Sequence, residues 1–229
     1  MSIIDEHYKL RDIRSKNYNQ QILYQSFVSF TTILYTAFMF VNIYNKINNL
    51  QNIFFYIFGL YLGDLLSGLI HVFLDKKKVN GFSMIDKMAF SFQYSHHKNP
   101  SEFYSNQQIL GISCQLKITF LLGVPIYCLT VALVSNNNIQ LALLLMNLSA
   151  VWSQIFHAFA HMPFKQIPLI IQILQKINII IPPHVHRSHH SSYDGNFSIV
   201  NGWSNPFLNL LYLYILRPIM SFFPNYFIE

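Results

Sequence analysis

The chain has 229 residues, of which 52% are hydrophobic and 10% are charged, and it carries a formal net charge of +6. A soluble domain usually carries about 25% charged residues, so this composition excludes an ordinary water-soluble protein and indicates a membrane protein. The basic residues gather in particular segments between the apolar runs, a distribution that indicates membrane topology and not a nucleic-acid-binding face. We therefore expect no nucleic acid among the partners.

The amino-terminal segment, residues 1–21, is polar and carries both acidic and basic residues. Its acidic residues are atypical of a transit peptide. We expect it to be a cytoplasmic segment and residues 22–229 to form one membrane domain. Its basic residues are Lys9, Arg11, Arg14 and Lys16.

Four apolar runs follow, and a membrane-spanning helix needs about 20 such residues. They are 22–44, 53–74, about 118–134 and about 139–160. The third run is shorter and contains Pro125. Two interrupted apolar stretches, 167–181 and 207–223, are expected to lie in the membrane interface. The predicted fold is an all-α integral membrane protein with about four transmembrane helices plus interfacial helices.

Lysine placement predicts the orientation of these helices. Six lysines lie between the second and third spans, whereas the connection after the first span holds only Lys46 and that after the third holds none. Because basic residues mark the cytoplasmic side, the amino terminus, the second connection and the carboxy-terminal third are expected to face the cytoplasm.

This topology, derived without histidine, places nine of the ten histidines at that cytoplasmic face. They are His71, His96, His97, His157, His161, His184, His186, His189 and His190. The tenth, His7, is distant and is left out of the predicted site. The two cysteines, Cys114 and Cys128, indicate neither a disulfide framework nor a thiolate metal site.

Spacing adds local geometry to the histidine cluster. His157 and His161 stand at i and i+4, on one face of a helix, as do His71 and Asp75. Asp64 lies two turns before His71 and projects to the same side. His186, His189 and His190 stand at i, i+3 and i+4 and so share one helix face. His96 and His97 are a contiguous pair that precedes Pro100.

The number of imidazoles indicates two metal ions. A zinc site uses about four ligands, and the clustered histidines with Asp75 exceed that twofold. Nitrogen-rich surroundings without cysteine fit an oxygen-activating pair of non-haem irons, although imidazole also binds zinc, copper and nickel. Single residues have plainer interpretations: His71 could be a packed polar residue and Asp64 a helix–helix hydrogen-bonding partner. Whether His184 or Asp64 contacts metal stays open.

Four ordered motifs resemble those of a lipid desaturase family. The first reads Asp-x-x-Ser-Gly-x-x-His-x-x-x-Asp from Asp64 to Asp75; the others are centred on His96-His97, on His157 and His161, and on 186–190 with the tail at 193–205. That family includes plasmanylethanolamine desaturases of the Kua type and plant chloroplast desaturases of phosphatidylglycerol palmitate. The resemblance covers roughly residues 53–216. The chain departs from the family pattern at two places. Val72 stands where the family usually has tryptophan, and Lys76 follows Asp75 where the family sequence tends to continue toward a glycine. These differences concern the identity of the substrate more than the metal centre.

The resemblance implies O2-dependent desaturation of an alkyl or acyl chain in an intact phospholipid at a site with two irons. It implies an external electron donor such as cytochrome b5 or a ferredoxin, and a location in the endoplasmic reticulum of a eukaryote or the inner membrane of a bacterium. Asp64 and Ser67 are expected to support the ligands by hydrogen bonds. The implied ligands are His71, Asp75, His96, His97, His157, His161, His186, His189 and His190.

Four other functions are alternatives to desaturation. A histidine-rich lipid or sterol hydroxylase uses a similar site and differs in its product. A transporter would place its site near the bilayer midplane, where only Asp64 is a candidate, and a bis-histidine haem protein would place its histidines deep in facing spans. A membrane metalloprotease is disfavoured because His-Glu-x-x-His is absent.

Overall fold

The computed structural model describes residues 2–15, 18–46, 52–98, 100 and 118–228. Over these residues the regular structure is helical apart from one isolated antiparallel bridge between Lys77 and Phe227. Cys114 lies outside the described residues, and Cys128 is a free, exposed thiol. The all-α prediction is therefore confirmed for the part of the chain that the structure describes.

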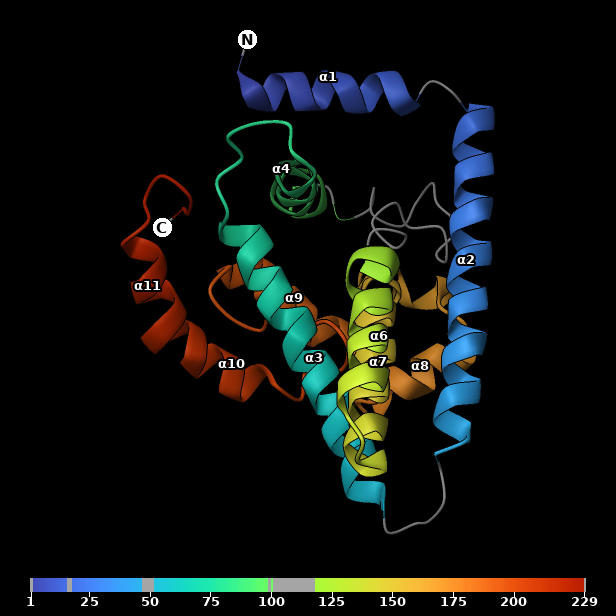
Figure 1. Ribbon diagram of the computed structural model, residues 1–229. Helices are drawn as coiled ribbons and strands as arrows, with labels where there is room; N and C mark the ends of the chain where they lie inside the picture. Colours follow the sequence, from blue (N-terminus) through green and yellow to red (C-terminus); the bar gives the residue numbers. More distant parts are fainter. Residues whose placement is uncertain (1, 16–17, 47–51, 99, 101–117, 229) are drawn as a thin grey trace.

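Three helices in the described ranges are long and apolar enough to cross a membrane. They are α2 (Tyr18–Tyr44), α3 (Ile53–Lys76) and α7 (Asn137–His161). Figure 1 shows them running lengthwise through the molecule, with the end of α3 and the end of α7 directed toward the same end as the start of α2. The chain is thus a membrane protein in which distant segments meet at one end of a helix bundle.

The third predicted span, expected at about 118–134, is a shorter apolar helix over 119–133. It forms a π-helical turn η5 (Thr119–Gly123) followed by α6 (Val124–Leu133), roughly 22 Å long against a hydrocarbon core of about 30 Å. The helix ends where Val134 turns extended, and the Asn136 side chain accepts hydrogen bonds from the first amides of α7. About four transmembrane helices were predicted. In the described residues three helices are long enough to span a membrane, and a shorter apolar helix accompanies them.

Helices α3 and α7 make the most extensive contact in the fold. At Gly59 a Cβ atom would lie 2.5 Å from the Ala142 carbonyl oxygen, so only glycine allows this approach. Asn147 on α7 donates to the Gly123 carbonyl at 2.8 Å and to the Tyr35 hydroxyl at 3.0 Å. Small residues and buried amide hydrogen bonds, the usual means of packing helices in lipid, thus fix α7 against its neighbours.

A polar cap lies across one end of the bundle. Helix α1 (Ile3–Ser15) runs crosswise there, with α4 (Met84–Phe90) and the π-helical turn η2 (Ser91–His96) nearby (Figure 1). His7, which sequence reasoning left out of the site, is buried; its Nε2 donates to the Gly81 carbonyl at 2.9 Å and its ring stacks on Phe90. We interpret His7 as a residue that docks α1 onto α4.

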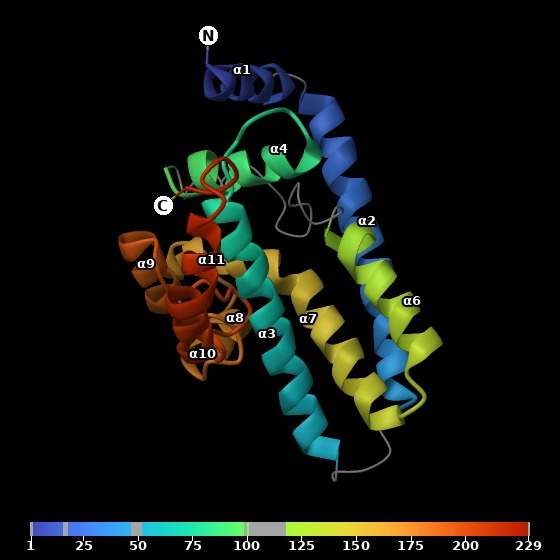
Figure 2. The same cartoon turned by 60° about the vertical axis from the view of Figure 1, so that its left-hand side comes forward.

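The carboxy-terminal third wraps around α3 and α7 as short helices (Figure 2). Helix α8 (Leu169–Lys176) exposes Leu169 and Ile170, as an interfacial helix would. Of the two apolar stretches predicted to be interfacial, residues 167–181 form only the short helix α8. Residues 207–223 overlap the elements α10 (Asn205–Leu211), η7 (Tyr212–Leu216) and α11 (Arg217–Ser221), which continue one another without a break. The remaining elements are η6 (Phe164–Gln166) and α9 (Pro183–Ser192).

Candidate metal centre

Two groups of potential metal ligands lie inside the polar end of the bundle, and together they contain all nine predicted ligands. Within each group the ligand atoms lie within 4.8 Å of one another. The first, the imidazole group, consists of His96, His157, His161, His186 and His190. The second, the carboxylate group, consists of His71, Asp75, His97 and His189.

Each group draws on several helices. His157 and His161 come from the last turns of α7, and His71 and Asp75 come from the last turns of α3. Helix α9 and the end of η2 supply the rest. No helix alone could form either group, so the fold of the whole bundle creates both.

Neighbouring histidines in the sequence enter different groups. Successive residues of a helix point about 100° apart, so His96 joins the imidazole group and His97 joins the carboxylate group. The same holds for His190 and His189, although the spacing of the fourth motif had suggested one shared face.

The imidazole group has the nitrogen spacing of a metal site. The Nε2 atom of His186 lies 2.7 Å from that of His157, 2.8 Å from that of His161 and 3.0 Å from that of His190. A ring nitrogen carries one proton or one lone pair and can complete only one hydrogen bond. Ligands at about 2.0–2.1 Å from a metal lie roughly 2.9–3.4 Å apart. The donor set therefore fits a metal ion better than it fits hydrogen bonding.

The carboxylate group is centred on Asp75. One oxygen of Asp75 lies 3.3 Å from His71 Nε2 and 3.2 Å from His189 Nε2, and the other lies 3.1 Å from His97 Nε2. The Nε2 atoms of His71 and His189 are buried and make no well-formed hydrogen bond to the described residues. Buried polar atoms left in this state are costly, and a cation among them would satisfy all of them.

Main-chain carbonyls fix which nitrogen of two histidines is available. His71 Nδ1 lies 2.8 Å from the Phe197 carbonyl oxygen, and His189 Nδ1 lies 2.8 Å from the Gly195 carbonyl oxygen. A carbonyl only accepts, so each Nδ1 carries the proton and each Nε2 keeps its lone pair. This is the outer hydrogen bond that metal-binding histidines usually make.

The two groups adjoin each other. The rings of His97 and His190 are 4.5 Å apart and stacked, and the rings of His71 and His157 are 5.4 Å apart. Each pair joins one member of each group. The two groups of potential ligands therefore share one wall.

Burial favours the uncharged form of three of the imidazoles. Burial, and then the neighbouring histidines, lower the pKa of His190 to about 3 and hold the pKa values of His96 and His186 well below the ordinary value of 6.5. Neutral imidazole is the form that binds a metal. The site is thus prepared for cations at neutral pH without first losing protons.

Asp64 belongs to neither group and instead anchors the loop that supports them. Its Oδ1 accepts from the amides of Val200, Asn201 and Gly202 at 3.1, 2.9 and 3.0 Å, and its Oδ2 accepts from the amide and hydroxyl of Ser204 at 2.9 and 2.7 Å. Five hydrogen bonds balance its buried charge. No polar atom of Asp64 is left over for a metal.

Ser67 also contacts this loop. Its hydroxyl donates to the Asp64 carbonyl at 2.7 Å and accepts from the Ile199 amide at 3.3 Å. Both residues therefore support the segment whose Phe197 carbonyl orients His71, and they contact no ligand directly through a hydrogen bond in the described residues. His184, left open at first, is exposed and lies outside both groups.

Sequence reasoning assigned no role to two residues near the centre. Tyr193 caps α9 in a left-handed conformation (φ 57°), and its ring lies 4.7 Å from that of His97. Gly195 supplies the carbonyl for His189. Both fall in the tail that resembles the family, which is the signal that could have directed attention to them.

Comparison with known proteins yields one family and two relatives. The model of the family described as lipid desaturase domain matches residues 60–217. The chain is 25% identical over 150 residues to fatty acid desaturase 4, chloroplastic, of Arabidopsis thaliana, which covers 64% of this chain and 45% of that protein. It is 33% identical over 60 residues to plasmanylethanolamine desaturase of Myxococcus xanthus, covering 26% of this chain and 21% of that protein.

These matches leave much of each relative uncovered, since they span less than half of its length. No solved structure matches the chain. The family match includes every member of both ligand groups.

Proposed function

The chain belongs to the lipid desaturase family, and from that premise we propose that it introduces a double bond into the alkyl or acyl chain of a membrane phospholipid, using O2 and two iron ions. The convergence of nine potential ligands into two adjoining groups carries this proposal. The two relatives are named as desaturases of fatty acid and of plasmanylethanolamine. An ether phospholipid or another phospholipid is the proposed substrate class.

The residues divide into ligands and supports. We assign one iron to His96, His157, His161, His186 and His190, and the other to His71, Asp75, His97 and His189. Asp75 supplies the single carboxylate, which offsets part of the positive charge that two irons bring into a buried site. The carbonyls of Phe197 and Gly195 orient two of the imidazoles.

An iron pair, when bound, supplies with O2 the oxidising power that an unactivated C–H bond requires. The overall reaction balances when two hydrogen atoms leave the lipid chain and an external donor adds two electrons and two protons, so that O2 becomes two water molecules. Burial of the ligands excludes bulk water from the site.

The remaining assignments follow from topology. We propose a multi-pass protein whose residues 1–21 are cytoplasmic and whose residues 22–229 form a single lipid desaturase domain. With the ligands at the cytoplasmic face, electrons would arrive from a soluble domain, cytochrome b5 or a ferredoxin. The membrane would be the endoplasmic reticulum in a eukaryote or the inner membrane in a bacterium.

Lipid analysis of cells with and without the gene tests the proposal, together with metal analysis of the purified protein. We expect phospholipids two mass units lighter, with a new double bond, and about two irons per chain. A hydroxylated product without a new double bond would show a hydroxylase instead. Zinc alone at one per chain, with activity retained, would refute the iron mechanism.

A further inference from the structure

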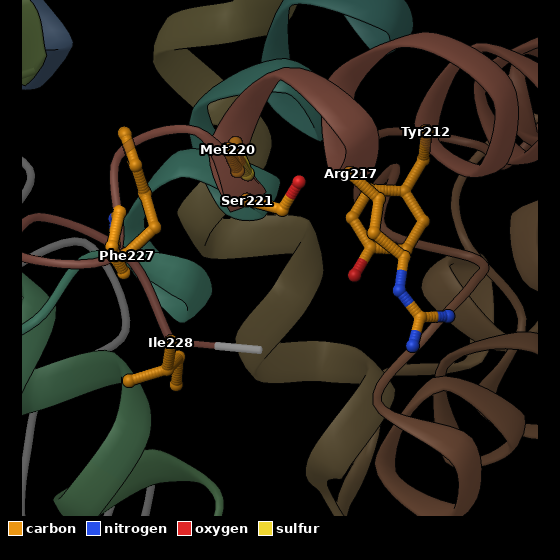
Figure 3. Close-up of a pocket in the computed structure, with 7 residues that line it drawn as sticks. Tyr212, Arg217, Met220, Ser221, Phe227 and Ile228 are labelled. Atoms are coloured by element: carbon orange, nitrogen blue, oxygen red, sulfur yellow. The ribbon is translucent and has the colours of Figure 1, made fainter.

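A cavity of about 180 Å³ lies between the end of the carboxy-terminal helix and the last residues of the chain. Figure 3 shows the side chains of Tyr212 and Arg217 side by side, with the Ser221 hydroxyl facing them and Phe227 and Ile228 on the other side. Met220 and Pro224 complete the wall. The lining thus combines one cation and two hydroxyl groups with apolar side chains.

The guanidinium group of Arg217 has N–H donors without an acceptor at hydrogen-bond distance among the described residues. Its guanidinium group is about half exposed (52%), and its only ionic partner among the described residues is Asp194, 3.8 Å away, which is beyond hydrogen-bond length. A guanidinium group presents five N–H donors in a fork that matches phosphate oxygens. No other lysine or arginine occurs after Arg187 in the sequence. The cavity therefore holds a guanidinium group that has no acceptor at hydrogen-bond distance among the described residues.

The local charge leaves room for one anion. Asp194 is already bound at Oδ1 by Lys76 Nζ at 2.8 Å and by the Tyr212 hydroxyl at 3.1 Å. Two cations, Lys76 and Arg217, thus share one carboxylate. Counting only Lys76, Arg217 and Asp194, the net charge is +1, which a single phosphodiester would neutralise.

The position of the cavity indicates a membrane ligand. Helix α11, which carries Arg217, and the two residues after it expose large apolar side chains: Ile219 is 50%, Phe222 80% and Phe223 50% accessible. Such side chains around one arginine are typical of the boundary between hydrocarbon and headgroups. An anion bound there would arrive from the membrane.

The cavity also lies close to the candidate metal centre. Ile228 lines both it and a second cavity of about 230 Å³ that reaches Asp75 and His97. The Ile228 amide donates to the Lys76 carbonyl at 2.7 Å, and Lys76 follows Asp75 directly. A group held at Arg217 is therefore one short segment away from the carboxylate group.

We propose that this cavity binds the phosphodiester of a membrane phospholipid through Arg217; the Ser221 and Tyr212 hydroxyls line the cavity but already donate to the Pro218 carbonyl and to Asp194. The proposal rests on the proposed function, because it places the headgroup of that reaction's substrate. The cavity is smaller than the roughly 300–1,000 Å³ of a site that encloses a whole ligand. It accommodates the phosphate end of the lipid and leaves the chains in the bilayer.

Lipid binding to the purified, iron-loaded protein in detergent tests this assignment without requiring turnover. The probes are dioleoyl phosphatidylethanolamine and dioleoylglycerol, which has the same chains without the phosphate, and inorganic phosphate serves as competitor. Native mass spectrometry measures the retained lipid. We expect the wild-type protein to prefer the phospholipid and Arg217→Gln to lose at least about tenfold of that preference, since a hydrogen bond to a charged group contributes about 1.5–3 kcal/mol.

Two further variants make the test decisive. Ser221→Phe fills the cavity from an exposed position and leaves Arg217 and Asp194 in place, and it should also abolish the preference. Lys165→Gln removes an exposed cation that lines neither cavity, and it should behave as wild type. Iron content and melting temperature of each variant show whether the fold is retained.

The outcomes separate the two proposals. Unchanged phospholipid preference in Arg217→Gln, or in Ser221→Phe, overturns the headgroup site even if cells still produce a double bond. Displacement of the phospholipid by inorganic phosphate at equal concentration would show a free-anion site and also overturn it. If the preference is lost in both variants but wild-type cells form no desaturated lipid, the headgroup site stands and the proposed reaction fails.

Discussion

His71 donates its Nδ1 proton to the carbonyl oxygen of Phe197, 126 positions later in the chain, across 2.8 Å. Phe197 is itself fully buried and packs against His189 with ring centroids 4.9 Å apart. The tail at 195–204 therefore orients two ligands of the carboxylate group. Asp64 holds that tail in place, which leads to the first prediction.

Asp64→Asn should loosen the tail and lower metal occupancy. The substitution removes the negative charge that accepts five hydrogen bonds and can turn an NH2 donor toward amide donors. We expect a loss of about 3 kcal/mol of stability, or roughly 6–12 °C in melting temperature, measured by thermal unfolding with iron analysis. Asp5→Asn, at an exposed position, is the control. Equal melting temperatures for the two variants would contradict the anchoring role.

His186→Ala and His184→Ala form a matched pair on α9. His186 is buried, and its Nε2 approaches three other ligand nitrogens, whereas His184 is exposed and lies outside both groups. We expect His186→Ala to lose iron and to reduce product by at least about 100-fold, because loss of an outer partner alone costs 10–100-fold. His184→Ala should keep both. Product formation and iron per chain decide the matter, and the assignment fails if both variants behave alike.

Metal uptake should persist in mild acid. The lowered pKa values of His96, His186 and His190, the last at about 3, mean that these rings stay neutral well below pH 6.5. Fe²⁺ loading of metal-free protein, followed by iron analysis from pH 8 to 5.5, should show little loss at pH 6. Uptake that falls with a midpoint near 6.5 would indicate solvated histidines and refute a buried site.

The same shifts predict the acid stability of the metal-free protein. Because the folded pKa of these histidines is lower than the unfolded value of about 6.5, the unfolded state binds more protons between those values, and stability falls as the pH drops. The stabilisation is complete above pH 6.5 and is lost progressively toward pH 3. Denaturant unfolding at pH 7.5 and pH 5 checks the sign, with greater stability expected at pH 7.5.

Side-chain type and helical spacing indicated from the sequence which histidines could converge, and the resemblance to the desaturase family implied the set of nine potential ligands. Each predicted i, i+4 pair does share a helix face and belongs to a single group: His157 and His161 to the imidazole group, and His71 and Asp75 to the carboxylate group. The division of His189 from His186 and His190 could not be predicted, because it depends on how α9 packs against the rest of the bundle. The three long helices and the shorter apolar helix over 119–133 followed from the lengths of the apolar runs.

The supporting contacts were beyond sequence reasoning for a different reason. The carbonyls of Phe197 and Gly195 act through the main chain, so no side-chain pattern reports them. Asp64 could be placed on the same side of α3 as His71, but its partners lie 136 to 140 positions away. A polar residue in a span indicates that a partner exists, and only the fold shows which one.

The last prediction concerns the contact that brings α3 and α7 together. Gly59→Val would place a side chain against the Ala142 carbonyl oxygen and the Leu145 Cβ, where even a Cβ atom would lie only 2.5 and 2.9 Å away. Overpacking of this kind costs about 1–3 kcal/mol. Helix α3 carries members of the carboxylate group and α7 carries members of the imidazole group. We therefore expect iron content to fall together with melting temperature. Gly81→Ala, whose new Cβ would meet its nearest atom at 3.4 Å, should change neither. Retained iron in Gly59→Val would show that the metal centre tolerates a wider helix separation.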